Sequence, residues 1–266
     1  MARAKPTDLK CKWFGLRHAE SNANRQGIII SDPKSGATQE GVRQAKESAE
    51  RWCQSIRELQ RPDRLLILTS DFSRASQTAD VFRKTIMEQQ PTLFSQIDYE
   101  VTPILRERVF GDLEGKSNEL YSLIWEDDLN QGEDFESHGS ESIRAVLDRV
   151  TSLIAQTDSR GVDQWIIFVS HGDVLQITQT WFRSIAGRLH RTDCSNNTLP
   201  RLSQFDTNIS NLDLIIYIPL LILAIHHDAR GQRSLKAILH YSKIMIRADQ
   251  FCPPTLSSSN RPDSEN

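Results

Sequence analysis

Residues 165–176 read WIIFVSHGDVLQ and hold a complete transition from strand to helix. The apolar run from Trp165 to Val169 is typical of a strand that is buried on both faces. Ser-His-Gly ends this run, and Asp173 with Gln176 has the form of a capping box, which predicts that a helix opens there and continues through Ile185. This one stretch therefore predicts a buried strand, polar residues at its end and a covering helix.

The same pattern occurs earlier in the chain. Lys12-Trp13-Phe14 and the apolar run Leu65 to Thr69 predict buried strands, and Tyr99 to Thr102 is a weaker strand candidate. Apolar residues at helical spacing predict helices over 38–59, capped by Thr38, over 75–86, capped by Ser73, and over 143–154 after a loop at 131–139. Strands that alternate with helices predict one α/β domain with a mostly parallel sheet covered on both sides.

The composition narrows the class of protein. The chain has 266 residues, of which 38% are hydrophobic and 25% charged, with a formal charge of −3. This balance gives no general attraction to nucleic acid or to an anionic membrane, so an anion site has to be local. The four cysteines form no C-x-x-C pair and the N-terminus has no apolar signal core. We therefore expect a cytoplasmic protein.

The apolar run Leu212 to Ile225 is the one membrane-like segment. It contains Asp213 and is broken by Pro219. As a helix it would measure roughly 20 Å, whereas a bilayer core is about 30 Å thick. We expect a buried strand or an apolar helix packed on the core, with peripheral membrane attachment as a weaker alternative.

Polar residues follow each of the three clearest strands. Arg17 and His18 follow the first, Ser70 and Arg74 the second, and His171 the third. Since ligands of open α/β sheets bind at the carboxyl ends of parallel strands, these residues are expected to meet at one edge. Arginine holds phosphate oxygens with paired N–H donors, and neutral histidine can act as a nucleophile. The combination suits phosphoryl transfer, for which Glu107 in Arg-Glu-Arg is a candidate acid.

Four motifs in order resemble those of the histidine phosphatase superfamily, which is also called phosphoglycerate mutase-like. They are Arg17-His18-Ala19-Glu20-Ser21 with Asn24; Ser70-Asp-Phe-Ser-Arg74-Ala-Ser-Gln-Thr-Ala79; Arg106-Glu107-Arg108 with Phe110-Gly111 and Glu114-Gly115; and Ser170-His171-Gly172. Thr38 with Gly41 and Gln44 is similar to the family's first-helix pattern. A single motif would be weak, but four in order make chance a poor explanation.

The resemblance implies a three-layer α/β/α sandwich and a phosphatase that needs neither metal nor cofactor. It implies that His18 is the nucleophile and forms a phosphohistidine, and that Glu107 protonates the leaving group. Arg17, Arg74 and His171 would hold the phosphoryl oxygens. Asn24 and Arg108 would assist them.

The chain also departs from the family pattern. Ala19 stands where the family has glycine, and the mutases' Gly-Trp-x-Asp element is missing from the loop after the first motif, so a phosphatase is favoured over a mutase. A catalytically inactive phosphate-binding scaffold remains an alternative. The substrate would be a small phosphorylated metabolite or a phosphoprotein; the oligomeric state is left open.

The expected organisation has four parts. They are an N-terminal extension at 1–11, a catalytic domain at 12–212, an atypical segment at 213–250 and a disordered polar tail at 251–266.

Overall fold

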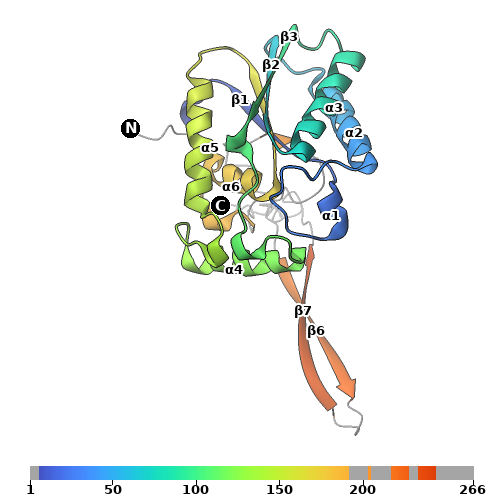
Figure 1. Ribbon diagram of the computed structural model, residues 1–266, viewed down its shortest axis with the longest axis vertical. Helices are drawn as coiled ribbons and strands as arrows, with labels where there is room; N and C mark the ends of the chain where they lie inside the picture. The colour runs from blue at the N-terminus through green and yellow to red at the C-terminus, as the bar shows by residue number, and fades with distance from the viewer. Residues whose placement is uncertain (1–5, 192–202, 205–216, 228–232, 244–266) are drawn as a thin grey trace, which may run out of the picture. The chain divides into compact units, whose positions relative to one another are not determined.

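The computed structural model describes residues 6–191, 203–204, 217–227 and 233–243 (Figure 1). The chain divides into two compact units, which are residues 1–208 and residues 209–266. The first unit is built on a sheet with the strand order β3-β2-β4-β1-β5. Its strands are β1 (Lys12–Arg17), β2 (Arg64–Ser70), β3 (Gln96–Thr102), β4 (Trp165–Ser170) and β5 (Ser203–Gln204). Its α-helices are α1 (Asn22–Gln26), α2 (Gln39–Ile56), α3 (Ser73–Gln89), α4 (Tyr121–Gln131), α5 (Ile143–Asp158) and α6 (Gly172–Phe182).

The sheet is mostly parallel, as predicted. β2 pairs in parallel with β3 and with β4, and β4 pairs in parallel with β1; the short β5 is antiparallel to β1. The chain thus returns late to insert β4 between β1 and β2. This insertion places the carboxyl ends of three strands side by side, and all three carry predicted site residues.

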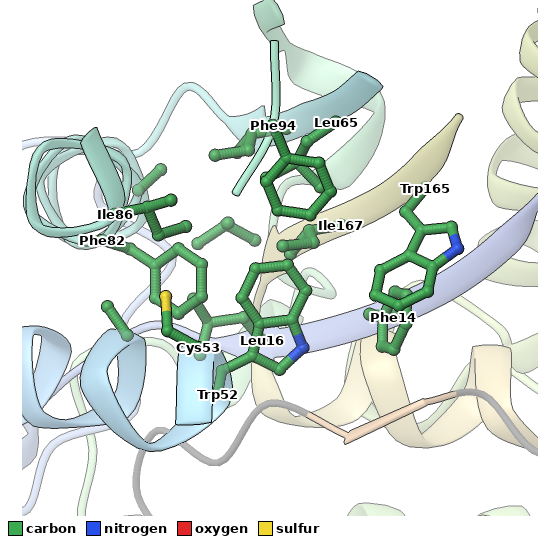
Figure 2. Packing of buried hydrophobic residues seen from close by; sticks show 14 of the residues in the cluster. Phe14, Leu16, Trp52, Cys53, Leu65, Phe82, Ile86, Phe94, Trp165 and Ile167 are labelled. Atoms are coloured by element: carbon green, nitrogen blue, oxygen red, sulfur yellow. The ribbon is translucent and has the colours of Figure 1, made fainter. Parts of the chain in front are cut away.

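Helices cover both faces of this sheet, which confirms the α/β/α sandwich. Figure 1 shows α2 and α3 on one face and α5 and α6 on the other. Figure 2 shows the first of these cores, where Trp52 of α2 packs against Phe82 of α3 and Trp165 of β4, with ring centroids 5.6 and 6.3 Å apart. Adjacent residues of β1 pack on opposite faces of the sheet. Phe14 belongs to the cluster under α2 and α3, and Trp13 belongs to the cluster under α5 and α6. Each apolar strand is therefore buried on both sides.

Two of the three predicted helix caps are wrong. Thr38 caps α2 as expected, because its Oγ1 accepts from the Gly41 N–H at 3.0 Å. However, α3 begins after Phe72, and α6 begins after His171; neither residue makes a side-chain cap. The carboxylate of Asp173 accepts instead from the Trp125 indole at 3.2 Å. The Asp173 side chain therefore binds Trp125 of another helix and does not cap its own helix.

α4 is a helix where no helix was predicted. It lies in the segment between β3 and α5 and has few buried positions, which are Ile124 and Asp128. Such a helix leaves almost no apolar stripe in the sequence.

The second unit contains an antiparallel hairpin of β6 (Tyr217–His227) and β7 (Arg233–Lys243). The described part of the apolar run at 212–225 is thus a strand and not a helix, and the predicted burial of this strand stays a prediction. The predicted tail at 251–266 lies outside the described residues. Among the helices that the structure describes, none is long and apolar enough to span a bilayer.

Candidate active site

The ends of β1, β2 and β4 bring the predicted histidines together. Arg17 is paired with Ser170 in the parallel register of β1 and β4, and the His18 N–H donates to the Ser170 carbonyl at 2.8 Å. The chain leaves β1 and β4 at adjacent positions, so the rings of His18 and His171 lie 5.1 Å apart, centroid to centroid. Both side chains are buried.

The loop after β1 is held firmly by the start of α2. Thr38 Oγ1 donates to the Glu20 carboxylate at 2.6 Å, and the Gln44 side chain accepts from the Glu20 N–H at 3.0 Å. A Cβ on Gly41 would lie 2.2 Å from the Glu20 carbonyl oxygen, so only glycine allows α2 to approach this closely. Glu20 therefore has a positioning function in the loop that carries His18.

Ala19, the departure from the family pattern, is fully buried in the same loop. Its N–H donates to Thr78 Oγ1 at 3.0 Å, which ties the loop to α3. The structure accommodates the extra methyl group without any exposed surface.

His18 is held as a neutral ring with a defined tautomer. Its Nδ1 lies 2.8 Å from the Ala19 carbonyl oxygen, which can only accept, so Nδ1 carries the hydrogen and Nε2 has the free lone pair. Burial lowers the pKa of His18 well below its usual value, and the charges of Arg74 and Arg17 lower it further. A neutral imidazole with an available Nε2 can attack an electrophile.

Arg17 and Arg74 are two cations without a carboxylate partner. Within the described part of the chain the Arg17 guanidinium makes no hydrogen bond or ion pair, and its Nε is buried. Arg74, which is 3% exposed, donates to the carbonyls of Asp32 at 3.0 Å and Ile30 at 3.2 Å. Two uncompensated guanidinium groups beside two neutral imidazoles form a site of positive charge.

Glu107 is a half-buried carboxyl group near these cations. One of its oxygens accepts from the Arg108 N–H at 2.9 Å. Desolvation, together with the charge of Asp173, raises its pKa to about 7, against the opposing effect of Arg74 and Arg17. The group can therefore carry a proton at neutral pH, as a general acid must.

Arg108 and Asn24 have other partners in this structure. Arg108 is fully buried, and its guanidinium binds both oxygens of Asp128 at 2.6 and 2.7 Å. Asn24 is exposed, and its Oδ1 accepts from the N–H and hydroxyl of Ser21 in the capping box of α1. The phosphate contacts expected of these two residues remain predictions.

A buried ion network behind Glu107 was absent from the sequence-based prediction. Asp173 has two cationic neighbours at 3.6 Å, Arg108 and Arg191. The Arg191 guanidinium lies 3.5 Å above the Trp125 ring. Asp128 and Trp125 belong to α4, a helix that the sequence pattern did not predict, so nothing pointed to these two residues as part of a network. Asp173 was predicted only as a residue that caps a helix.

The loop at 26–37 is also tied to the site. Ser31 donates both its N–H and its hydroxyl to the Glu114 carboxylate, at 2.7 and 2.5 Å, and its hydroxyl oxygen lies 3.2 Å from the Arg108 carbonyl oxygen. Gln77 of α3 accepts from the Ala37 N–H at 2.8 Å. Together with the carbonyls bound by Arg74, these contacts fix the loop over the cationic site.

His138, the histidine of the loop before α5, is exposed, with a positive φ of 52°. No group of three or more His, Cys, Asp or Glu residues that could hold a metal ion occurs in the described residues.

Known proteins resemble this chain over the part that carries the site. The model of the histidine phosphatase superfamily (branch 1) matches residues 14–210. A metal-independent phosphoserine phosphatase from Arabidopsis thaliana is 31% identical over 188 residues, which are 65% of this chain and 70% of that protein.

Solved structures share the fold. A mycobacterial glucosyl-3-phosphoglycerate phosphatase in complex with VO3 has a TM-score of 0.54 at 22% identity, covering 68% of this chain and 84% of its own. A mycobacterial hydrolase has a TM-score of 0.56 at 19% identity, covering 73% of this chain and 96% of its own. The length of the family match, together with the sandwich fold, leads to one conclusion: this chain belongs to the histidine phosphatase superfamily, branch 1.

Proposed function

We propose that this protein is a phosphatase that hydrolyses a phosphomonoester through a phosphohistidine on His18, with Glu107 as the proton donor. The observation that carries the proposal is the position of a neutral His18, whose Nδ1 carries the hydrogen, beside two guanidinium groups that form no ion pair with a described residue, those of Arg17 and Arg74. A phosphate dianion supplies the two negative charges that these cations lack.

In the first half-reaction, His18 Nε2 attacks phosphorus and the bond from phosphorus to the leaving oxygen breaks. The electron pair of that bond stays on the leaving oxygen, which takes the proton of Glu107 and departs as an alcohol. Arg17, Arg74 and His171 stabilise the charge that spreads over the equatorial oxygens. This role for Glu107 is supported by its raised pKa of about 7, at which a substantial fraction of the carboxyl group carries a proton at neutral pH.

In the second half-reaction, water attacks the phosphorus of the phosphohistidine. The Glu107 carboxylate takes a proton from this water, and the bond from Nε2 to phosphorus breaks, which returns a neutral His18 and releases phosphate. No group in the cycle needs a metal ion, and the Arabidopsis relative is by name metal-independent.

A carboxyl group that can carry a proton at neutral pH supports an enzyme, because protonation of a leaving group is a step that a phosphate-binding scaffold does not need. Ionised at neutral pH, this carboxylate would repel a bound phosphate; protonated, it can donate. A small phosphorylated metabolite is the favoured substrate. Phosphoserine is the first to test because of the 31% identical relative, and phosphopeptides are the alternative.

The test is to trap the phosphoenzyme. The protein is mixed with ³²P-labelled phosphoserine and with a panel of labelled sugar phosphates and phosphopeptides, then quenched. We expect an acid-labile, base-stable label on His18 that is absent from His18→Ala. Full turnover by His18→Ala would exclude the mechanism, and binding of phosphate with no turnover of any ester would favour the scaffold.

A further inference from the structure

A hydrogen bond between two buried side chains joins the ends of β2 and β4. His171 Nε2 lies 3.0 Å from the hydroxyl oxygen of Ser70, and both side chains are fully buried. A neutral imidazole has one N–H donor and one acceptor nitrogen, so this contact decides which nitrogen carries the hydrogen. Burial and the charge of Arg74 lower the pKa of His171 well below its usual value, so the ring is neutral near pH 7.

The other contacts of Ser70 settle the direction of the bond. Its hydroxyl oxygen already accepts from the Phe72 N–H at 3.2 Å. Across the described residues, His171 Nε2 is the only acceptor within hydrogen-bond distance of this hydroxyl. If Nε2 carried the hydrogen, both the hydroxyl hydrogen of Ser70 and the lone pair of His171 Nδ1 would be buried without a partner among the described residues, whereas with the hydrogen on Nδ1 only that N–H group lacks one. The hydroxyl therefore donates to Nε2, and the hydrogen of the ring is on Nδ1.

The Nδ1–H group of His171 is itself unsatisfied. Nδ1 is buried and has no hydrogen-bond partner in the part of the chain that the structure describes. The Nε of Arg17 is in the same state, and both residues border His18. Buried donors in native proteins are almost always satisfied, so two such donors beside the proposed nucleophile call for an acceptor that binds there.

We propose that Ser70 is a positioning residue that holds His171 in the Nδ1–H tautomer, so that the neutral ring donates a hydrogen bond to a phosphoryl oxygen. This inference rests on the proposed function for the identity of the acceptor. In the opposite tautomer the Nδ1 lone pair would face the oxygen and repel it. Ser70 touches no substrate; it acts through His171.

The test compares Ser70→Ala with Ser170→Ala. Ser170 is equally buried and directly precedes His171, but its hydroxyl donates to the Leu105 carbonyl at 2.8 Å. Long-range ¹H–¹⁵N spectra of ¹⁵N-histidine protein report the tautomer, with the His171 signals assigned by their loss in His171→Asn. We expect Nδ1–H in the wild type and in Ser170→Ala, and a shift toward Nε2–H in Ser70→Ala.

Orthovanadate binding and turnover of 4-nitrophenyl phosphate provide the second readout. We expect Ser70→Ala to weaken orthovanadate binding and lower kcat by about tenfold, the effect of one charge-assisted hydrogen bond. Ser70→Thr, which keeps the hydroxyl, should restore both. A wild-type ring protonated at Nε2 would overturn the proposal even if Ser70→Ala does not fold, as would an unchanged tautomer in Ser70→Ala.

The two proposals fail separately. If the wild type neither binds orthovanadate nor turns over any ester, the proposed function is wrong. The tautomer that Ser70 imposes is measured without either ligand, so the NMR result decides the Ser70 inference by itself.

Discussion

Arg108 and Asp128 form a two-pronged ion pair in which both side chains are almost completely buried. The pair joins the segment after β3 to α4, and the Arg108 Nε also donates to the Glu141 carbonyl at 2.6 Å. A cation bound in this way is part of the architecture. Arg17, by contrast, has no partner within the described residues and is available for a ligand.

The two arginines should therefore respond differently to the same substitution. Arg108→Met leaves the Asp128 carboxylate buried without its guanidinium partner, so we expect the free energy of unfolding to fall by about 3–5 kcal/mol. Arg17→Met removes an unpaired cation, so stability should change little while kcat/KM falls about 100-fold or more. Urea unfolding and steady-state kinetics measure both. If Arg108→Met keeps wild-type stability and loses orthovanadate affinity, Arg108 binds phosphate as the sequence predicted.

Glu107→Gln should separate protonation of the leaving group from the rest of the reaction. We expect kcat for an alkyl phosphate such as phosphoserine to fall by about 10²–10⁴, the usual contribution of a general acid. 4-Nitrophenyl phosphate, whose leaving group departs without a proton, should be affected much less. Equal losses on both substrates would argue that Glu107 only shapes the site.

The same variant should gain stability at alkaline pH. The folded-state pKa of Glu107, about 7, is above its ordinary value of 4.5, so the folded state binds more protons between these limits and wild-type stability falls as pH rises through them. Glutamine does not titrate. Glu107→Gln should therefore exceed the wild type by roughly 1–3 kcal/mol at pH 8, discounted for partial exposure, and by little near pH 4.5. Chemical unfolding at the two pH values tests this, and a pH-independent difference would contradict it.

Asp173→Asn should move the alkaline limit of activity. Asp173 is a buried anion that raises the pKa of Glu107. Without Asp173 the pKa of Glu107 falls. As the pH is raised, kcat/KM should therefore begin to decline at a pH about one unit lower than in the wild type. Asp71→Asn is the matched control, because it removes one carboxylate charge from a partly exposed ion pair with Arg106. An unshifted profile in Asp173→Asn would remove the proposed electrostatic coupling.

His18→Asn should abolish the phosphoenzyme and also change acid stability. The folded-state pKa of His18 is below its ordinary value of 6.5, so below pH 6.5 the unfolded wild type binds the extra proton and wild-type stability falls. Asparagine does not bind this proton, so the variant does not lose stability in this way. The stability of His18→Asn relative to the wild type should rise by up to about 1.4 kcal/mol for each pH unit below 6.5, measured by urea unfolding. A constant difference would mean that His18 titrates normally in the folded state.

The strands and the larger helices were predictable because their signals are local. The continuous apolar runs at β2 and β4 and the helical spacing in α2 and α5 depend only on neighbouring residues, and the structure confirms each of them. α4 left no such signal, since most of its residues are not buried. Asp173 shows the opposite failure, in which a local capping signal is overridden by the tertiary contact with Trp125.

The order of the motifs was enough to select His18, His171, Arg17, Arg74 and Glu107 as candidate site residues, because side chains that follow parallel strands must gather at one edge of the sheet. Only the tertiary structure decided their states. The neutral form of His18, the raised pKa of Glu107 and the contact between Ser70 and His171 all arise from burial and from charges on distant segments. The same is true of the difference between Arg17, which has no partner among the described residues, and Arg108, which is bound to Asp128. The sequence identifies the chemical groups of the site. Their protonation and their ion pairs depend on which of these groups the fold buries next to one another.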